Sequence, residues 1–255
     1  MKTKKVLENL DNITKEDVIE AYNEILNNSK KALAIVGALD KADILPQIED
    51  TLGTLPASTD NNFNIPKPVL TEKKEVTNIK SDLNQAHIIK GWQVQTYGEE
   101  DYPALILLNI MLGACGLSSR LFLELRDKKG LAYVVRSSYE TYKLAGNFMI
   151  YIATEAKNIE VSLKGFDEEI EKIRTIPVSE KELNDAKNNL IGKCAFLDET
   201  NVQQACSYAK YEALGFGFEY TEKMKELVKE VTAEQVLACA QKYFNDTYVL
   251  SIIKP

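Results

Sequence analysis

The sequence of 255 residues is poor in side chains that hold metals. It contains one histidine, His87, and four cysteines, none of them spaced as C-x-x-C: Cys115, Cys194, Cys206 and Cys239. A catalytic zinc takes three protein ligands and keeps an open position, and paired cysteine spacing is the signature of a structural zinc site. The sequence therefore predicts no metal site in this chain. His87 lies in the apolar stretch AHIIKGW, which favours a structural role for it.

Positive charge is also in deficit. Lysine and arginine number 31 against 38 acidic residues, which gives a formal net charge of −7. A nucleic-acid binder needs a basic face to neutralise phosphates, so we expect no nucleic-acid partner. No apolar run approaches the roughly 20 residues that span a bilayer, so we expect no membrane partner either. Scattered cysteines in a chain of this length are typical of a reduced protein, and we expect a cytoplasmic location.

Familiar catalytic motifs are missing as well. The sequence has no G-x-S-x-G, no P-loop and no G-x-G-x-x-G. Carboxylates are abundant, but they alternate with lysines and no pair can be singled out. We therefore identify no catalytic residue for metal chemistry in this chain, and no cofactor of its own.

What is present is an ordinary globular composition, 45% hydrophobic and 27% charged, with one clear interruption. From Leu55 to Pro68, three prolines and many small polar residues break every periodic pattern. We predict a first segment over 1–55, a linker over 56–70 and a complete domain over 71–255.

Hydrophobic spacing predicts mixed elements on both sides of the linker. Before it, we expect a capped helix over 13–28, a buried strand over 32–38 and a further helix ending near Gly53. After it, we expect strands, an apolar helix from Tyr102, a second helix, a β-hairpin, helices over 158–244 and a closing strand. The predicted fold class is α+β, a mostly antiparallel sheet with helices packed on one face.

Two distant segments resemble each other. ITKEDVIEAYNEILNN (13–28) matches VTAEQVLACAQKYFND (231–246) in residue type, with Thr, Glu, Val and Asn identical, and each leads into an apolar stretch. A repeat at such an offset is typical of a duplicated domain. On this interpretation the chain begins with the end of a homologous first domain; the alternative is that a helix followed by a strand recurs by chance.

The most informative stretch is GLSSRLFLELRDKKGLAY, which runs from Gly116 to Tyr133. Its spacing predicts a helix with a buried stripe that ends at Gly130, followed by a strand. Arg126 lies near the helix end and Tyr133 at the strand start, so a tight turn can bring them together. Residue types alone favour a structural interpretation of the pair, a dipole-compensating arginine and a half-buried tyrosine.

This stretch, followed by a hairpin that ends in GNFMIYIATEA, resembles the C-terminal, non-zinc half of the M16 (insulinase or pitrilysin-like) zinc peptidases. VGALDKADILPQIEDTLGTLP (36–56) resembles the close of that family's catalytic domain, and residues 69–255 resemble its second, homologous domain. The resemblance implies that Arg126 and Tyr133 reach the peptide substrate beside the metal and stabilise the transition state. The family's H-x-x-E-H zinc motif is absent here.

The resemblance therefore predicts the substrate-binding part of a zinc metalloendopeptidase that is inactive alone. Its expected partners are a peptide substrate and a zinc-bearing half, on the same or a separate chain, with zinc in the complete enzyme. Self-association, or docking onto the second domain, is expected where the first segment exposes apolar surface. Two alternatives stay open: a non-catalytic M16-like subunit or peptide-binding scaffold that never meets a zinc site, and an unrelated α+β binding module.

Overall fold

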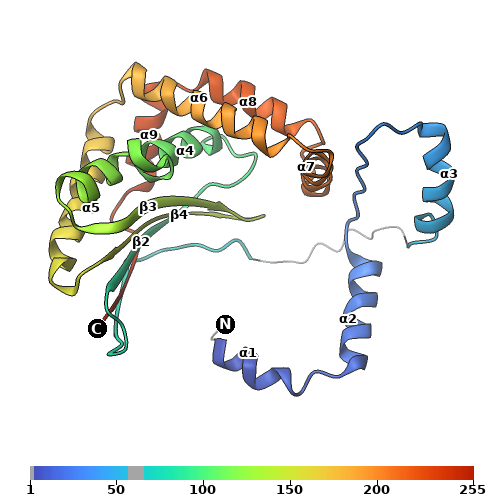
Figure 1. Ribbon diagram of the computed structural model, residues 1–255, viewed down its shortest axis with the longest axis horizontal. Coiled ribbons are helices and arrows are strands. Elements are labelled where there is room, and N and C mark those ends of the chain that lie inside the picture. The colour runs from blue at the N-terminus through green and yellow to red at the C-terminus, as the bar shows by residue number, and fades with distance from the viewer. Residues whose placement is uncertain (1–2, 57–65) are drawn as a thin grey trace. The chain divides into compact units, whose positions relative to one another are not determined.

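The computed structural model of the chain describes residues 3–56 and 66–255 (Figure 1). Two compact units are formed: Met1–Ile65 with Thr200–Phe218, and Pro66–Glu199 with Glu219–Pro255. Most of the predicted linker, residues 57–65, lies outside the described residues. The predicted domains, 1–55 and 71–255, stay predictions; the compact units place 200–218 with the N-terminal segment.

The N-terminal unit contains helices α1 (Thr3–Leu10), α2 (Lys15–Asn28), α3 (Lys41–Leu52) and α7 (Asn201–Leu214). Helix α2 begins as predicted with a capping box, in which Thr14 and Asp17 bond each other's backbone N–H groups. No residue of α2 is buried. Its amphipathic face therefore has no partner within the described chain.

The strand predicted over 32–38 is wrong. These residues form no strand, and Leu33 and Ile35 are exposed. A strand needs a neighbouring strand for its backbone N–H and C=O groups, and the described part of this unit contains none. An apolar composition predicts a buried strand only where a sheet is present for the strand to join.

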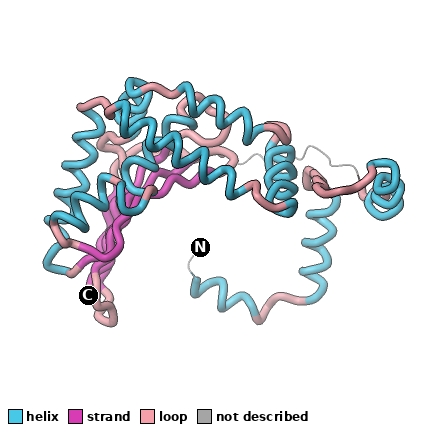
Figure 2. The backbone as a smooth tube through the Cα atoms, turned by 45° about the horizontal axis from the view of Figure 1, so that its top comes forward, coloured by secondary structure: helices cyan, strands magenta, loops and turns pink. Residues whose placement is uncertain are grey.

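The second unit is built on one five-stranded sheet in the order β1-β5-β2-β4-β3. Figure 2 shows the strands in magenta, gathered in one layer beside the helices. Strands β1 and β5 pair in parallel, and the other three pairs are antiparallel. The strands are β1 (Lys74–Ile79), β2 (Ala86–Val94), β3 (Ala132–Thr141), β4 (Gly146–Thr154) and β5 (Val249–Lys254). Strand β3 forms one edge of the sheet, which leaves its outer hydrogen-bonding groups without a strand partner.

Helices of this unit cover one face of the sheet (Figure 1). They are α4 (Tyr102–Asn109), α5 (Ile159–Thr175), α6 (Glu180–Leu197), α8 (Tyr220–Glu230) and α9 (Ala233–Tyr243). The core lies between the two layers, where Phe148, Phe166 and Phe244 are fully buried. Alternate residues of β2 point away from the helices and are only half-buried or exposed. This confirms the predicted α+β class with helices on one face.

Short helical segments connect α4 to β3. They are the π-helix η1 (Ile110–Ala114), the 3-10 turn η2 (Gly116–Ser118) and the π-helix η3 (Phe122–Lys128). A further 3-10 turn, η4 (Ala156–Asn158), leads into α5. The predicted continuous helices in this region are thus partly π-helical, and π-helical segments occur frequently at functional sites.

Candidate functional site

The stretch from Gly116 to Tyr133 is firmly anchored to the core. Leu121 and Leu125 are fully buried, and Leu125 lies close against Gly165 of α5, which leaves no space for a side chain there. Arg120 makes a bidentate ion pair with Glu182 of α6, with both N–O distances at 2.7 Å. Because the helix η3 is fixed on its buried side, the direction of its remaining side chains is fixed too.

Arg126 lies on η3 between two aromatic rings. Its guanidinium carbon is 4.6 Å from the centroid of the Phe122 ring and 4.7 Å from that of the Tyr133 ring. Among the described residues no carboxylate forms an ion pair with it. A guanidinium stacked on rings keeps its N–H groups free at the edge of its plane. Arg126 is therefore held in place while its hydrogen-bonding capacity stays available.

Tyr133 occupies a β-bulge at the start of β3. Ala132 pairs with Thr154 and Val134 with Ala153, so Tyr133 is the extra residue that has no opposite number on β4. Gly130 adopts a positive φ of 61° just before it, which ends the helix and turns the chain into the strand. Bulges redirect side chains and are enriched beside active sites. Here the bulge leaves the Tyr133 side chain 78% exposed.

The hydroxyl of Tyr133 makes no hydrogen bond to any described residue. Tyr139, on the same strand, behaves differently: its hydroxyl donates to the backbone oxygen of Gln95 at 2.7 Å, and burial raises its pKa. Arg126 and Tyr133 are thus brought together as predicted. Of the tyrosines on β3, it is the exposed Tyr133 whose hydroxyl donates to no described residue.

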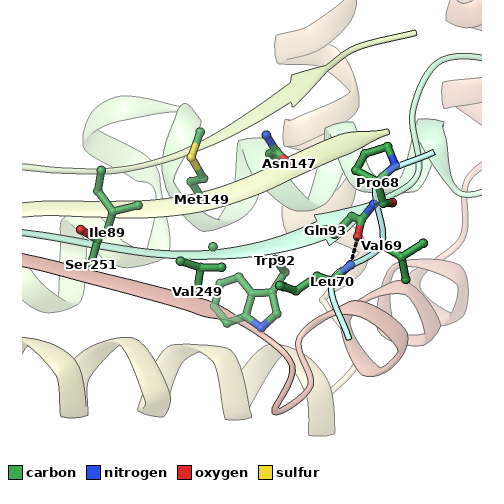
Figure 3. A pocket seen from close by; sticks show the side chains of 11 residues that line it. Pro68, Val69, Leu70, Ile89, Trp92, Gln93, Asn147, Met149, Val249 and Ser251 are labelled. Carbon is green, nitrogen blue, oxygen red and sulfur yellow. Dashed lines mark hydrogen bonds between the residues drawn. The ribbon is translucent and has the colours of Figure 1, made fainter. Parts of the chain in front are cut away.

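The face of the sheet opposite the helices carries a shallow apolar hollow of about 380 Å³ (Figure 3). Ile89 and Gly91 of β2, Met149 of β4 and Val249 of β5 line it. Gly91 has no side chain to fill the hollow, and a Cβ there would lie only 3.1 Å from Cγ of Met149. The segment Pro68–Leu70 borders it, with the backbone N–H of Leu70 donating to the Gln93 side chain at 2.6 Å. We call this surface the open face.

Comparison with known proteins identifies the family. The family model described as "Peptidase M16 inactive domain" matches residues 12–190. The chain belongs to the M16 peptidase family. A Rickettsia felis protein called "Uncharacterized zinc protease" is 29% identical over 247 residues, which cover 96% of this chain and 58% of the relative. The assignment of this chain to the M16 family thus rests on similarity over most of the chain's length.

Other M16-type relatives agree. YmfF of Bacillus subtilis, called "Probable inactive metalloprotease", is 26% identical over 94% of this chain and 56% of its own length. The crystal structure of a peptidase M16 inactive domain from Pseudomonas fluorescens superposes with a TM-score of 0.78 at 26% identity, over 95% of this chain and 58% of that chain. The chain therefore spans little more than half the length of these three M16 relatives.

The residues of this M16 chain do not fit a zinc site. The single histidine, His87, has its Nδ1 at 2.9 Å from the hydroxyl of Tyr151. Within the described ranges, no three His, Cys, Asp or Glu side chains are grouped so as to hold a metal ion. In the same residues, no helix has both the length and the apolar character needed to cross a membrane.

Sequence reasoning predicted that Arg126 and Tyr133 lie side by side, as they do, but it did not predict the polar cluster around His87. The predicted structural role of His87 took no account of Tyr151 and Arg136, which lie on the two strands beyond β2. The signal was present in the alternation of β2, β3 and β4, because the three residues take the outward positions once the strand register is known.

Proposed function

We propose that the chain is the substrate-binding half of an M16-type zinc metalloendopeptidase, inactive alone, which holds a peptide beside a zinc site on a part of the protein outside this chain or on another chain. The observation that carries the proposal is the contact between Arg126 and Tyr133: a cation without a carboxylate partner lies 4.7 Å from the ring of an exposed tyrosine whose hydroxyl is unused.

The residue types suit peptide hydrolysis. In the tetrahedral intermediate the former carbonyl oxygen gains negative charge, and a preorganised hydroxyl donor such as that of Tyr133 stabilises it. The Arg126 guanidinium donates to a neighbouring peptide carbonyl and fixes the register of the substrate. Zinc, supplied by the other half, would activate the attacking water, and this chain contributes binding and orientation.

Edge strand β3 supplies a place for the peptide. Tyr133 lies at its start, and the outer side of β3 has no strand partner in the described sheet. A peptide that adds as a strand takes its affinity from backbone hydrogen bonds, which explains broad tolerance of sequence. The substrate class we propose is therefore an extended peptide segment.

The exposed apolar face of α2 in the N-terminal unit favours the proposal of a zinc-bearing half outside this chain. Val18 and Ile25 on α2 are exposed, whereas their counterparts in the repeat, Val236 and Tyr243 on α9, are buried against the second unit's core. Both helices begin with a capping box of the same form. An α2 that closes a homologous zinc-bearing domain would bury the same face.

The test is a reconstituted enzyme. The zinc-bearing half is sought by its H-x-x-E-H motif, first in the reading frame upstream of Met1 and then in neighbouring genes. We expect Tyr133→Phe to lower kcat by about 10²–10³-fold, because it removes one oxyanion donor. Arg126→Ala should lower kcat/KM strongly through lost positioning of the substrate.

Two matched variants separate these roles from general damage. Tyr142→Phe removes an exposed hydroxyl just beyond the end of β3, and Lys128→Ala removes a neighbouring cation of η3. Both should keep full activity. Unchanged turnover in Tyr133→Phe, or equal losses in all four variants with unaltered melting temperatures, would refute the assigned roles.

A second candidate is a non-catalytic M16-like subunit or peptide-binding scaffold. The name of the B. subtilis relative YmfF, "Probable inactive metalloprotease", favours it. The two candidates differ in one result: a scaffold binds peptide with the same affinity whether or not a zinc-bearing half is added, and no cleavage follows.

A further inference from the structure

The sequence contains four arginines, and they fall into two kinds. Arg120 and Arg174 pair with glutamates, at 2.7 Å and 3.3 Å. Arg126 and Arg136 pair with no carboxylate among the described residues, and each lies over a tyrosine ring. Arg126 belongs to the site already described. Arg136 has the same properties and no assigned role.

Arg136 is part of a polar cluster that crosses three strands of the open face. Its guanidinium carbon lies 5.6 Å from the ring centroid of Tyr151, its register partner on β4. The Tyr151 hydroxyl is 2.9 Å from Nδ1 of His87 on β2, and the two rings are stacked. The Arg136 guanidinium thus lies over the Tyr151 ring, and the contact with His87 fixes the position of Tyr151.

The surroundings of Arg136 on the open face are neutral. The flanking outward positions of β3 are Val134 and Ser138, and its neighbour beyond Tyr151 on β2 is Ile89. The next carboxylate on this side of β3 is Glu140, four residues away, which is about 13 Å along a strand. Glu140 accepts a hydrogen bond from the Tyr142 hydroxyl. Among the described residues, no carboxylate is therefore a direct register neighbour of Arg136 on the open face, and none forms an ion pair with it.

We infer that Arg136, Tyr151 and His87 form a carboxylate-binding subsite for the peptide, an inference that rests on the proposed function of the chain. A guanidinium that lies over a ring without a carboxylate partner keeps N–H groups available, and their fork geometry matches the two oxygens of a carboxylate. The Tyr151 hydroxyl and the His87 ring supply further polar contacts on the same side. The chemistry recognised is a single carboxylate.

The strand geometry gives the subsite a position relative to the scissile bond. Tyr133 and Arg136 are three residues apart on β3, which is about 10 Å. A peptide extended beside β3 has the same rise per residue, so the carboxylate belongs about three residues from the carbonyl that Tyr133 holds. It comes from an acidic side chain or from the peptide's own C-terminus.

The test uses the tag-free chain, whose single histidine and single tryptophan make the imidazole C–H signals and the one indole N–H signal assignable without ambiguity. Three probes share one neutral, extended sequence: a C-terminal amide with an internal glutamine, an amide with glutamate in its place, and the glutamine peptide with a free C-terminal carboxylate. We expect a carboxylate-bearing peptide to shift the His87 ring signal and to bind at least about tenfold more tightly than the neutral amide.

The tryptophan is the internal control. The Trp92 ring lies on the helix side of the sheet, with its N–H donating to the Asn245 backbone oxygen at 3.0 Å, so its signal should stay in place. Whichever of the two carboxylate peptides binds more tightly identifies the source. Equal affinity for all three probes, or no His87 shift at saturating peptide, would overturn the inference.

Variants assign the effect to the cluster. Arg136→Gln should abolish the preference for a carboxylate, Tyr151→Phe should weaken it, and Lys181→Gln, which removes an exposed charge from α6, should leave it intact. A preference that survives in a folded Arg136→Gln chain overturns the inference. The readout needs no turnover, so failure of the proposed peptidase role, measured by cleavage in the reconstituted enzyme, and failure of this subsite, measured by peptide affinity of the chain, give different results.

Discussion

At the scale of single residues, the four cysteines differ in reactivity because they differ in burial. Cys239 lies buried on α9, and burial, assisted by the nearby Asp101 carboxylate, raises its pKa to about 12. Cys206 is exposed. Since the thiolate is the nucleophile, we expect iodoacetamide at pH 8 to modify Cys206 rapidly in the native chain and Cys239 only in urea. Mass spectrometry of the alkylated peptides measures this, and native labelling of Cys239 at the rate of Cys206 would contradict it.

The site residues also differ in how far sequence could predict them. A helix stop at Gly130 between Arg126 and Tyr133 is visible in the sequence, and it correctly placed the two side by side. The π-helical winding of η3 and the bulge at Tyr133 were not predictable, because both depend on pairing and packing with residues distant in sequence. The cluster of Arg136, Tyr151 and His87 needed the strand register for the same reason.

At the scale of elements, Asp101 ties the start of α4 to the end of α9. Its Oδ2 accepts hydrogen bonds from Lys242 Nζ and from Tyr243 Oη, both at 2.6 Å. Burial alone would raise the pKa of the Asp101 carboxyl, but these hydrogen bonds outweigh it and the pKa is lowered. Stability from such a carboxyl is present above its unfolded-state pKa of about 3.9 and is lost as pH falls through the lower folded-state value.

We therefore expect Asp101→Asn to lower the free energy of unfolding by about 1–3 kcal/mol at pH 7, and the difference from wild type to shrink as pH falls below about 4. Urea unfolding at pH 7 and pH 3 measures both values. Asp185→Asn is the control, because its pair with Lys181 is exposed and should cost less than about 0.5 kcal/mol. An Asp101→Asn deficit of the same size at both pH values would exclude this role for the charge.

Local signals predicted helix starts well, because a capping box depends only on residues of the same turn. The capping boxes of α2 and α9 begin with Thr14 and Thr232, each followed three residues later by the polar residue that completes the box. The prediction of a strand over 32–38 was wrong because a strand forms by pairing with a neighbouring strand, which composition alone does not supply. Its counterpart in the repeat, β5, lies between β1 and β2 and is a strand for that reason.

At the scale of the whole molecule, the two copies of the repeat are in opposite situations. On α9, Val236 and Tyr243 are buried against the sheet and its helices. On α2, the corresponding residues Val18 and Ile25 are 58% and 62% exposed. An apolar helix face that none of the described residues covers favours association, because burying it removes apolar area from water.

We expect the isolated chain to self-associate through this face, and the double variant Val18→Ser/Ile25→Ser to reduce that association. Sedimentation velocity over a range of concentrations measures it, with far-UV circular dichroism as the check on folding. Val161→Ser/Leu227→Ser is the matched control, because it removes two exposed apolar side chains from α5 and α8 in the other unit. Equal concentration dependence in wild type and in the α2 variant would contradict the role of this face. Loss of binding to the proposed zinc-bearing half in the same variant would show that self-association and binding of that half use the same face of α2.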